Sequence, residues 1–125
     1  MRGYPESPQT IGQHLKKRRL DLRLTQSQAA RIFGITYNTL SHWEIGQTEP
    51  EVCMLPAITQ FLGYSPYPAP TNFSEKIAAL RMRLGLGKQR LADLLEADVK
   101  SVRNWESGRT KPLARWKKKL EDMML

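Results

Sequence analysis

The 125-residue sequence lacks the features that mark disulfide-bonded, zinc-binding and membrane-spanning proteins. Its single cysteine, Cys53, excludes an internal disulfide bond and a zinc site built from several cysteines. The first ten residues, MRGYPESPQT, lack the apolar core of a signal peptide. No window approaches the run of about 18 apolar residues that a membrane span needs. From these absences we expect a soluble intracellular protein with no membrane attachment, in a reducing compartment.

Acidic residues are also scarce. The chain has 12 Asp and Glu against 20 Lys and Arg, which gives a net charge of +8 and a pI near 9.9. Residues 1–62 hold 7 basic and 5 acidic residues (net +2), whereas residues 63–125 hold 13 and 7 (net +6). Such an excess indicates a polyanionic partner, with nucleic acid ahead of an anionic membrane surface.

The sequence repeats itself with a period of 62 residues. The pattern Trp-Glu-x-Gly-x-Thr-x-Pro occurs at 43–50 and again at 105–112, and sliding the chain by 62 aligns 11–50 with 73–112 without a gap. Apolar positions keep their phase through the alignment, which predicts two copies of one fold. Residues 63–71, GYSPYPAPT, separate the copies, and their three prolines favour an extended linker of at most roughly 28 Å. The predicted domains are 1–62, the linker 63–71, and 72–125.

Each copy is predicted to be a bundle of short helices, because no segment shows sustained strand alternation. Threonine caps begin the first three helices, glycines close the second and third, and a fourth helix through EVCML is followed by a fifth that restarts at Pro56. The second copy is predicted to have helices at 74–84, 88–95, 99–106 and from 113 to near the C-terminus. The side chains expected to face inward in the first two helices are Ile11, Leu15, Leu22, Ala29, Ala30, Ile32 and Phe33.

A helix-turn-helix arrangement explains the residues of 25–44. Two helices that cross closely need a small residue such as Ala30, and the turn needs positive φ, which Gly34 supplies. Leu40 and Trp43, with Ile35, then anchor the second helix, whose outer positions would point into a DNA major groove.

The stretch LTQSQAARIFGITYNTLSHWEIGQTEP at 24–50 resembles the Xre/Cro–phage-repressor helix-turn-helix family. The resemblance covers 11–62, and 73–122 resembles a second, diverged copy. It implies an all-α fold of two tandem lambda-repressor-like helix-turn-helix bundles joined by a Pro-rich linker. It also implies a sequence-specific, double-stranded DNA-binding transcriptional regulator that is not an enzyme and needs no cofactor or metal. Repression is the commonest mode in this family, and a cytoplasmic, nucleoid-associated protein of bacteria or phages is the implied setting.

The resemblance also implies residue roles. Asn38 is the best candidate for reading a base, since an amide can pair with both N6 and N7 of adenine. The other base-reading positions are Tyr37, Thr39 and His42, with Lys100, Ser101, Arg103 and Asn104 in the second copy. The phosphate-binding positions are Gln26, Gln47, Thr48, Lys88, Arg109, Thr110 and Lys111. The family's ion pair between the first helix and the end of the recognition helix would join Arg19 to Glu44 and Arg81 to Glu106.

The second copy departs from the family pattern at three places. Glu96 replaces the turn glycine, Gly87-Lys88 replaces the Thr-Gln pair, and Asp98 caps the recognition helix. These departures argue against sequence-specific reading by this copy, whereas its charge of +6 argues for a position near DNA.

Several alternatives stay open on the sequence. A monomeric pseudo-dimer and a homodimer both fit the repeat. An antitoxin or similar interaction protein would need an exposed apolar surface, for which 61–68 and 123–125 are candidates. An architectural or transposition-accessory DNA binder would bend DNA with little sequence preference. Neither histidine sits in a metal-ligand spacing, and no catalytic set of residues is evident.

Overall fold

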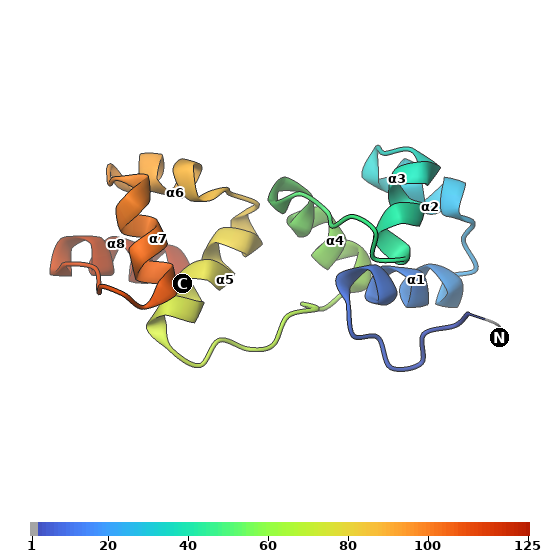
Figure 1. Ribbon diagram of the computed structural model, residues 1–125, viewed down its shortest axis with the longest axis horizontal. Coiled ribbons are helices and arrows are strands. Elements are labelled where there is room, and N and C mark those ends of the chain that lie inside the picture. The colour runs from blue at the N-terminus through green and yellow to red at the C-terminus, as the bar shows by residue number, and fades with distance from the viewer. Residues whose placement is uncertain (1–2) are drawn as a thin grey trace. The chain divides into compact units, whose positions relative to one another are not determined.

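The computed structural model describes residues 3–125, and all of the regular structure in that range is helical (Figure 1). The chain forms two compact units, one ending at Pro68 and the other comprising Ala69–Leu125. Across residues 3–125, no helix combines the length and apolar character needed to cross a membrane.

The first unit contains α1 (Ile11–Asp21), α2 (Gln26–Phe33), α3 (Tyr37–Glu44), a 3₁₀ turn η1 (Val52–Met54) and α4 (Leu55–Leu62). The side chains of Thr10, Thr25 and Thr36 each accept a hydrogen bond from the backbone N–H three residues later. These bonds satisfy donors that the first turn of a helix leaves unpaired, so the threonines determine where α1, α2 and α3 begin. Gly34 ends α2 at φ 68°, in the left-handed region that the turn into α3 requires.

The core of the first unit lies where α1, α2 and α3 pack together and α4 covers them. Its deepest side chains are Leu15, Ala29, Ala30, Leu40 and Ile58, each at most 2 % exposed. Trp43 is 5 % exposed and its ring meets Phe33 edge-on at 6.3 Å, so the tryptophan of the repeated motif is a core residue.

Two expected core residues of the first unit are instead exposed. Leu22 is 44 % exposed because α1 ends at Asp21 and Leu22 is its C-cap. Ile32 is 58 % exposed because the buried stripe of α2 is narrow and consists of Ala29, Ala30 and Phe33. At 100° per residue, Ile32 lies to one side of that stripe.

The segment after the recognition helix also differs from expectation. Val52–Met54 is a 3₁₀ turn that runs directly into α4 at Leu55, so the predicted helix through EVCML is only this short turn, and the helix predicted to restart at Pro56 begins one residue earlier. Pro56 lies in the first turn of α4, where its missing N–H is not needed. The first unit ends at Pro68, which lies within the predicted linker 63–71.

The second unit contains α5 (Phe73–Leu84), α6 (Lys88–Leu95), α7 (Val99–Ser107) and α8 (Ala114–Met124). Its core includes Ile77, Leu91, Val102, Trp105 and Leu120. α8 closes this core: the indole N–H of Trp116 donates to the carbonyl of Leu95 at 3.0 Å, and the ring lies 5.7 Å from that of Trp105. Glu96 ends α6 at φ 55°, so a glutamate occupies the left-handed position that Gly34 occupies in the first unit.

Candidate nucleic-acid interface

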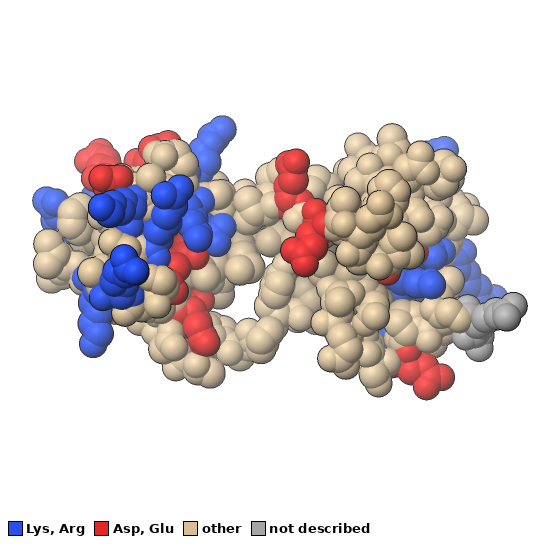
Figure 2. Space-filling model, in the orientation of Figure 1, with Lys and Arg blue, Asp and Glu red and all other residues tan. Residues whose placement is uncertain are grey.

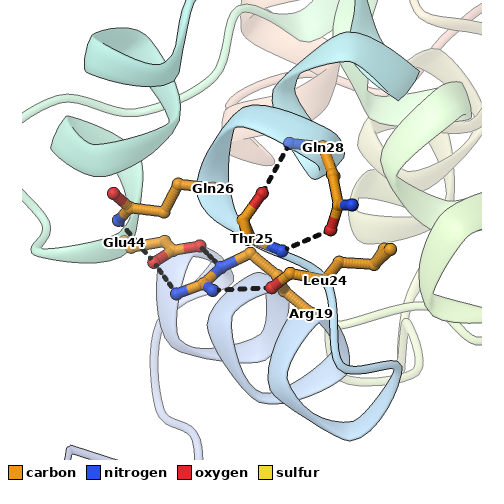
Figure 3. Close-up of polar contacts among 6 residues, drawn as sticks. All are labelled: Arg19, Leu24, Thr25, Gln26, Gln28 and Glu44. Atoms are coloured by element: carbon orange, nitrogen blue, oxygen red, sulfur yellow. Dashed lines mark hydrogen bonds and ion pairs between the residues drawn. The ribbon is translucent and has the colours of Figure 1, made fainter.

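A buried ion pair between Arg19 and Glu44, called the clamp below, holds α3 against α1 in the first unit. Nε and Nη2 of Arg19 donate to the two carboxylate oxygens of Glu44 at 2.7 and 2.9 Å, and Nη1 donates to the carbonyl of Leu24 at 3.0 Å (Figure 3). Arg19 is 8 % exposed and Glu44 is 5 % exposed. A bidentate pair of this kind fixes both distance and orientation, so the end of α3 has one position relative to α1.

Gln26 extends this contact to the start of α2. Its side-chain N–H donates to Glu44 Oε1 at 3.1 Å, and the neighbouring Thr25 and Gln28 form a reciprocal capping box (Figure 3). Glu44 therefore joins three helices. Gln26 was predicted to bind phosphate; in the structure one amide hydrogen serves Glu44, which leaves the second for an acceptor outside the protein. In residues 3–125, no buried side-chain N or O atom lacks a hydrogen-bond partner, so the clamp carries no unpaired charge.

The outer face of α3 is open to solvent. Leu40 and Trp43 are buried on its inner face, whereas Tyr37 is 55 % exposed and Asn38 and His42 are classed as exposed. Thr39 differs from the other predicted readers, because its hydroxyl lies 3.0 Å from that of Thr36 and takes part in the helix cap. Three of the four residues predicted to read bases in this unit thus project outward together.

The loop after α3 presents side chains rather than backbone donors. The N–H groups of Gln47 and Thr48 both donate to the carbonyl of His42, at 2.9 and 3.3 Å. In the second unit, Arg109 and Thr110 donate in the same way to Asn104, at 3.0 and 3.3 Å. The side chains of these loop residues are exposed, so any phosphate contact from them would come from the side chains.

The second unit has the same clamp with one partner fewer. Arg81 donates to Glu106 at 2.9 and 3.1 Å and to the carbonyl of Leu86 at 3.1 Å. Lys88 stands where Gln26 stands in the first unit, and it is exposed. The Glu106 side chain is 9 % exposed against 1 % for Glu44, so the second ion pair is less completely shielded from water.

The outer face of α7 is basic, unlike that of α3. Lys100 and Arg103 are exposed and Ser101 and Asn104 are half-buried, whereas residues 37–44 contain no lysine or arginine. Figure 2 shows lysine and arginine side chains gathered over α7 and its neighbouring segments, while the surface over α3 is largely uncharged. Asp98 caps α7 by accepting from the N–H of Lys100 at 3.2 Å, and Lys88, Arg109 and Lys111 add exposed positive charge.

Two apolar segments were candidates for a protein-binding surface. Met123 and Met124 pack against the core of the second unit, and only Leu125 is fully exposed. In the segment 61–68, Tyr64 lies against α1 through His14. Tyr64 and Tyr67 are 46 % and 41 % exposed, and the most exposed large aliphatic side chains other than Leu125 lie elsewhere, at Ile32, Ile45, Leu94 and Leu113. Ile45 directly follows α3 and was not predicted as a surface residue. Its place between Glu44 and Gly46 of the repeated motif does not indicate that its side chain is exposed.

Metal-ligating groups do not converge in the part of the chain that the structure describes. Within residues 3–125, no three His, Cys, Asp or Glu side chains come together in a way that could hold an ion. His14 is instead paired with Tyr64, and burial together with the charge of nearby Lys17 lowers the pKa of its imidazole.

Comparison with known proteins finds a similarity within the first unit. A family model described as Helix-turn-helix matches residues 15–67, which span α1 to α4 and the segment that follows. No curated protein and no solved structure matches the chain. The match supports a DNA-binding, helix-turn-helix transcription regulator. The second unit lies outside the matched range.

Proposed function

We propose that this chain is a sequence-specific regulator of transcription that binds double-stranded DNA with both of its helical units. One observation carries the proposal: Tyr37, Asn38 and His42 project from a helix whose inner side is fixed by the buried Arg19–Glu44 pair. A helix that is held rigidly from behind and polar on its outer face is what major-groove reading requires.

The dimensions of a helix suit this role. With its side chains an α-helix is about 10–12 Å across, and the major groove of B-DNA is about 12 Å wide and admits one helix. Asn38, on the first turn, would pair with an adenine, and Tyr37 and His42 would contact neighbouring base edges. Gln26, Gln47 and Thr48 would set the position of the unit on the phosphates.

The second unit is proposed as a diverged copy that binds the DNA backbone more than the bases. Its helix order and its Arg81–Glu106 clamp parallel those of the first unit. Its net charge is +6, and Lys100 and Arg103 lie exposed on α7 where the first unit has neutral side chains. Ser101 and Asn104 would add contacts in the groove, and the phosphate set would be Lys88, Arg109, Thr110 and Lys111.

The proposed complex is one chain on one asymmetric site, with the two units on successive stretches of the same duplex. A site covered in this way over a promoter would exclude polymerase, so we propose repression as the mode of regulation. A homodimer would instead bind a palindromic site, because a two-fold assembly reads two equal half-sites.

Selection of bound fragments from a pool of random duplexes tests the proposal. We expect a short, well-defined motif beside a less specific flank, and one protein chain per duplex by mass measurement. Binding without any enriched motif would support the architectural alternative instead. Absence of binding at low salt, together with recovery of a stoichiometric protein partner, would support the interaction protein.

A further inference from the structure

The chain turns back on the first unit immediately after α4. Gly63 ends this helix at φ 82°, and its N–H donates to the carbonyl of Thr59 at 2.9 Å. This left-handed residue sends the next side chain toward α1: the hydroxyl of Tyr64 lies 2.8 Å from Nδ1 of His14. The two rings also meet edge-on, with centroids 5.6 Å apart. Tyr64 therefore bonds to a helix that lies 50 residues earlier in the sequence.

Further contacts lie at the end of α4 and within residues 63–68. Nε of Arg18, one turn further along α1, donates to the carbonyl of Phe61 at 3.1 Å. The N–H of Tyr67 donates to the hydroxyl of Ser65 at 3.3 Å, so the chain is bent here rather than extended. Burial and the nearby Glu49 carboxylate raise the pKa of the Tyr67 phenol. The first compact unit ends at Pro68 and so includes residues 63–68.

This folding shortens the segment that is free to span between the units. From Pro68 to Phe73 there are five residue steps, which reach at most about 18 Å. If residues 63–68 were released, eleven steps from Leu62 to Phe73 would reach at most about 40 Å. The gain in reach on release is this difference of about 22 Å less the distance that residues 63–68 already cover along the first unit, so it is at most about six base pairs at 3.4 Å per base pair.

We propose that Tyr64 is a positioning residue: by bonding to His14 it limits the reach of the second unit and thereby sets the spacing between the two DNA contacts. The statement on spacing rests on the proposed function, since it requires that both units touch one duplex. The statement on reach rests only on contacts inside the first unit.

The reach is tested in the free protein by a pair of spin labels. One label is attached to Cys53, the single cysteine of the chain, and the other to a cysteine introduced by Lys118→Cys on the exposed side of α8. The Tyr64→Ala variant should broaden the distribution of label distances and extend its upper edge, by at most about 22 Å. Tyr4→Ala is the matched control, because Tyr4 also bonds to α1, through Asp21 at 2.7 Å, but lies outside the spanning segment. Identical distributions in the parent and Tyr64→Ala would overturn the proposal.

The spacing is tested on DNA with duplexes in which the two contacted stretches are moved apart one base pair at a time. The parent and Tyr4→Ala should bind tightly at one narrow range of spacings. Tyr64→Ala should also accept spacings up to about six base pairs longer. The same narrow range in all three proteins would overturn the proposal. If the parent binds no duplex, the proposed function fails, and the label distances alone then decide whether Tyr64 limits the reach.

Discussion

The two helical units present similar clamps behind different outer faces. In both, an arginine late in the first helix donates twice to a glutamate in the last turn of the outward helix and once to a backbone carbonyl five residues on. The outward faces differ in charge, since α3 has no lysine or arginine and α7 has Lys100 and Arg103. The repeated residues therefore support the outward helix, and the differing residues between them set the charge of its outer face.

The contacts that hold the outward helix in place also differ between the two units, at two places. In the first unit, Gly12 lies so close to α3 that an added Cβ would meet the carbonyl oxygen of Trp43 at 1.7 Å. The equivalent residue of the second unit is Ser74, whose hydroxyl would be 3.7 Å from a Cβ added at Gly108. The first helix thus packs backbone to backbone in one unit and leaves room for a side chain in the other. With Glu96 in place of a turn glycine, these differences indicate a more tightly specified outward helix in the first unit.

Removal of the clamp arginine should have the largest effect. Arg19→Ala leaves the buried Glu44 carboxylate without its main partner, which costs about 3–5 kcal/mol of stability. Arg81→Ala should cost less, because Glu106 is more exposed and can be hydrated. Hydrogen exchange resolved by peptide reports each unit separately, and Arg31→Ala, an exposed change in α2, serves as the control. An equal or larger loss for Arg81→Ala would contradict the difference between the clamps.

Gly12→Ala should come next. The added methyl would overlap the Trp43 carbonyl, so α1 must shift away from α3, at about 1–3 kcal/mol for an overpacked contact. Ser74→Ala, the matched change in the second unit, removes only a hydroxyl and should leave stability nearly unchanged. Urea midpoints of the two variants check this. A neutral Gly12→Ala would mean that α1 and α3 are not in backbone contact.

Alanine substitutions on the outer faces of α3 and α7 test how the two units differ in binding DNA. Asn38→Ala should reduce discrimination at one base pair by about 1–3 kcal/mol and leave the salt dependence of binding unchanged. Lys100→Ala, the equivalent change on α7, should weaken binding to all sequences alike and lower the slope of log K against log salt by about 1. Binding titrations over several salt concentrations with matched and mismatched sites separate the two. A sequence-dependent loss in Lys100→Ala would make α7 a second reader.

The sequence predicts much of this fold, because its signals are local. The threonine caps and Gly34 lie at the helix boundaries that hydrogen bonding requires, and all helices of the second unit begin and end within one residue of their predicted bounds, where a bound was predicted. The Arg19–Glu44 contact followed from a family resemblance and not from spacing alone.

What the sequence does not predict depends on packing between distant residues. Apolar character did not distinguish buried Phe33 from exposed Ile32, since the width of the buried stripe is set by α1 and α3. Three prolines indicated an extended linker, yet Tyr64 bonds to His14 at 2.8 Å, a contact between residues 50 positions apart that leaves no local signature. The second amide hydrogen of Gln26 and the cap role of Thr39 likewise depend on partners that only the folded unit brings near.

The smallest expected effect lies at the turn between α6 and α7. Glu96 adopts φ 55°, a left-handed conformation that costs a residue with a Cβ about 1–2 kcal/mol. Glu96→Gly removes this cost but adds freedom to the unfolded chain, which takes back about 0.4–1 kcal/mol, so we expect a net gain of about 0.5–1 kcal/mol. Glu96→Ala is the control, because it removes the same charge and keeps the Cβ; it should give no such gain. If Glu96→Gly and Glu96→Ala stabilise the second unit equally in thermal unfolding, the gain comes from removal of the charge and not from relief of backbone strain. The turns of the two units would then carry the same backbone cost.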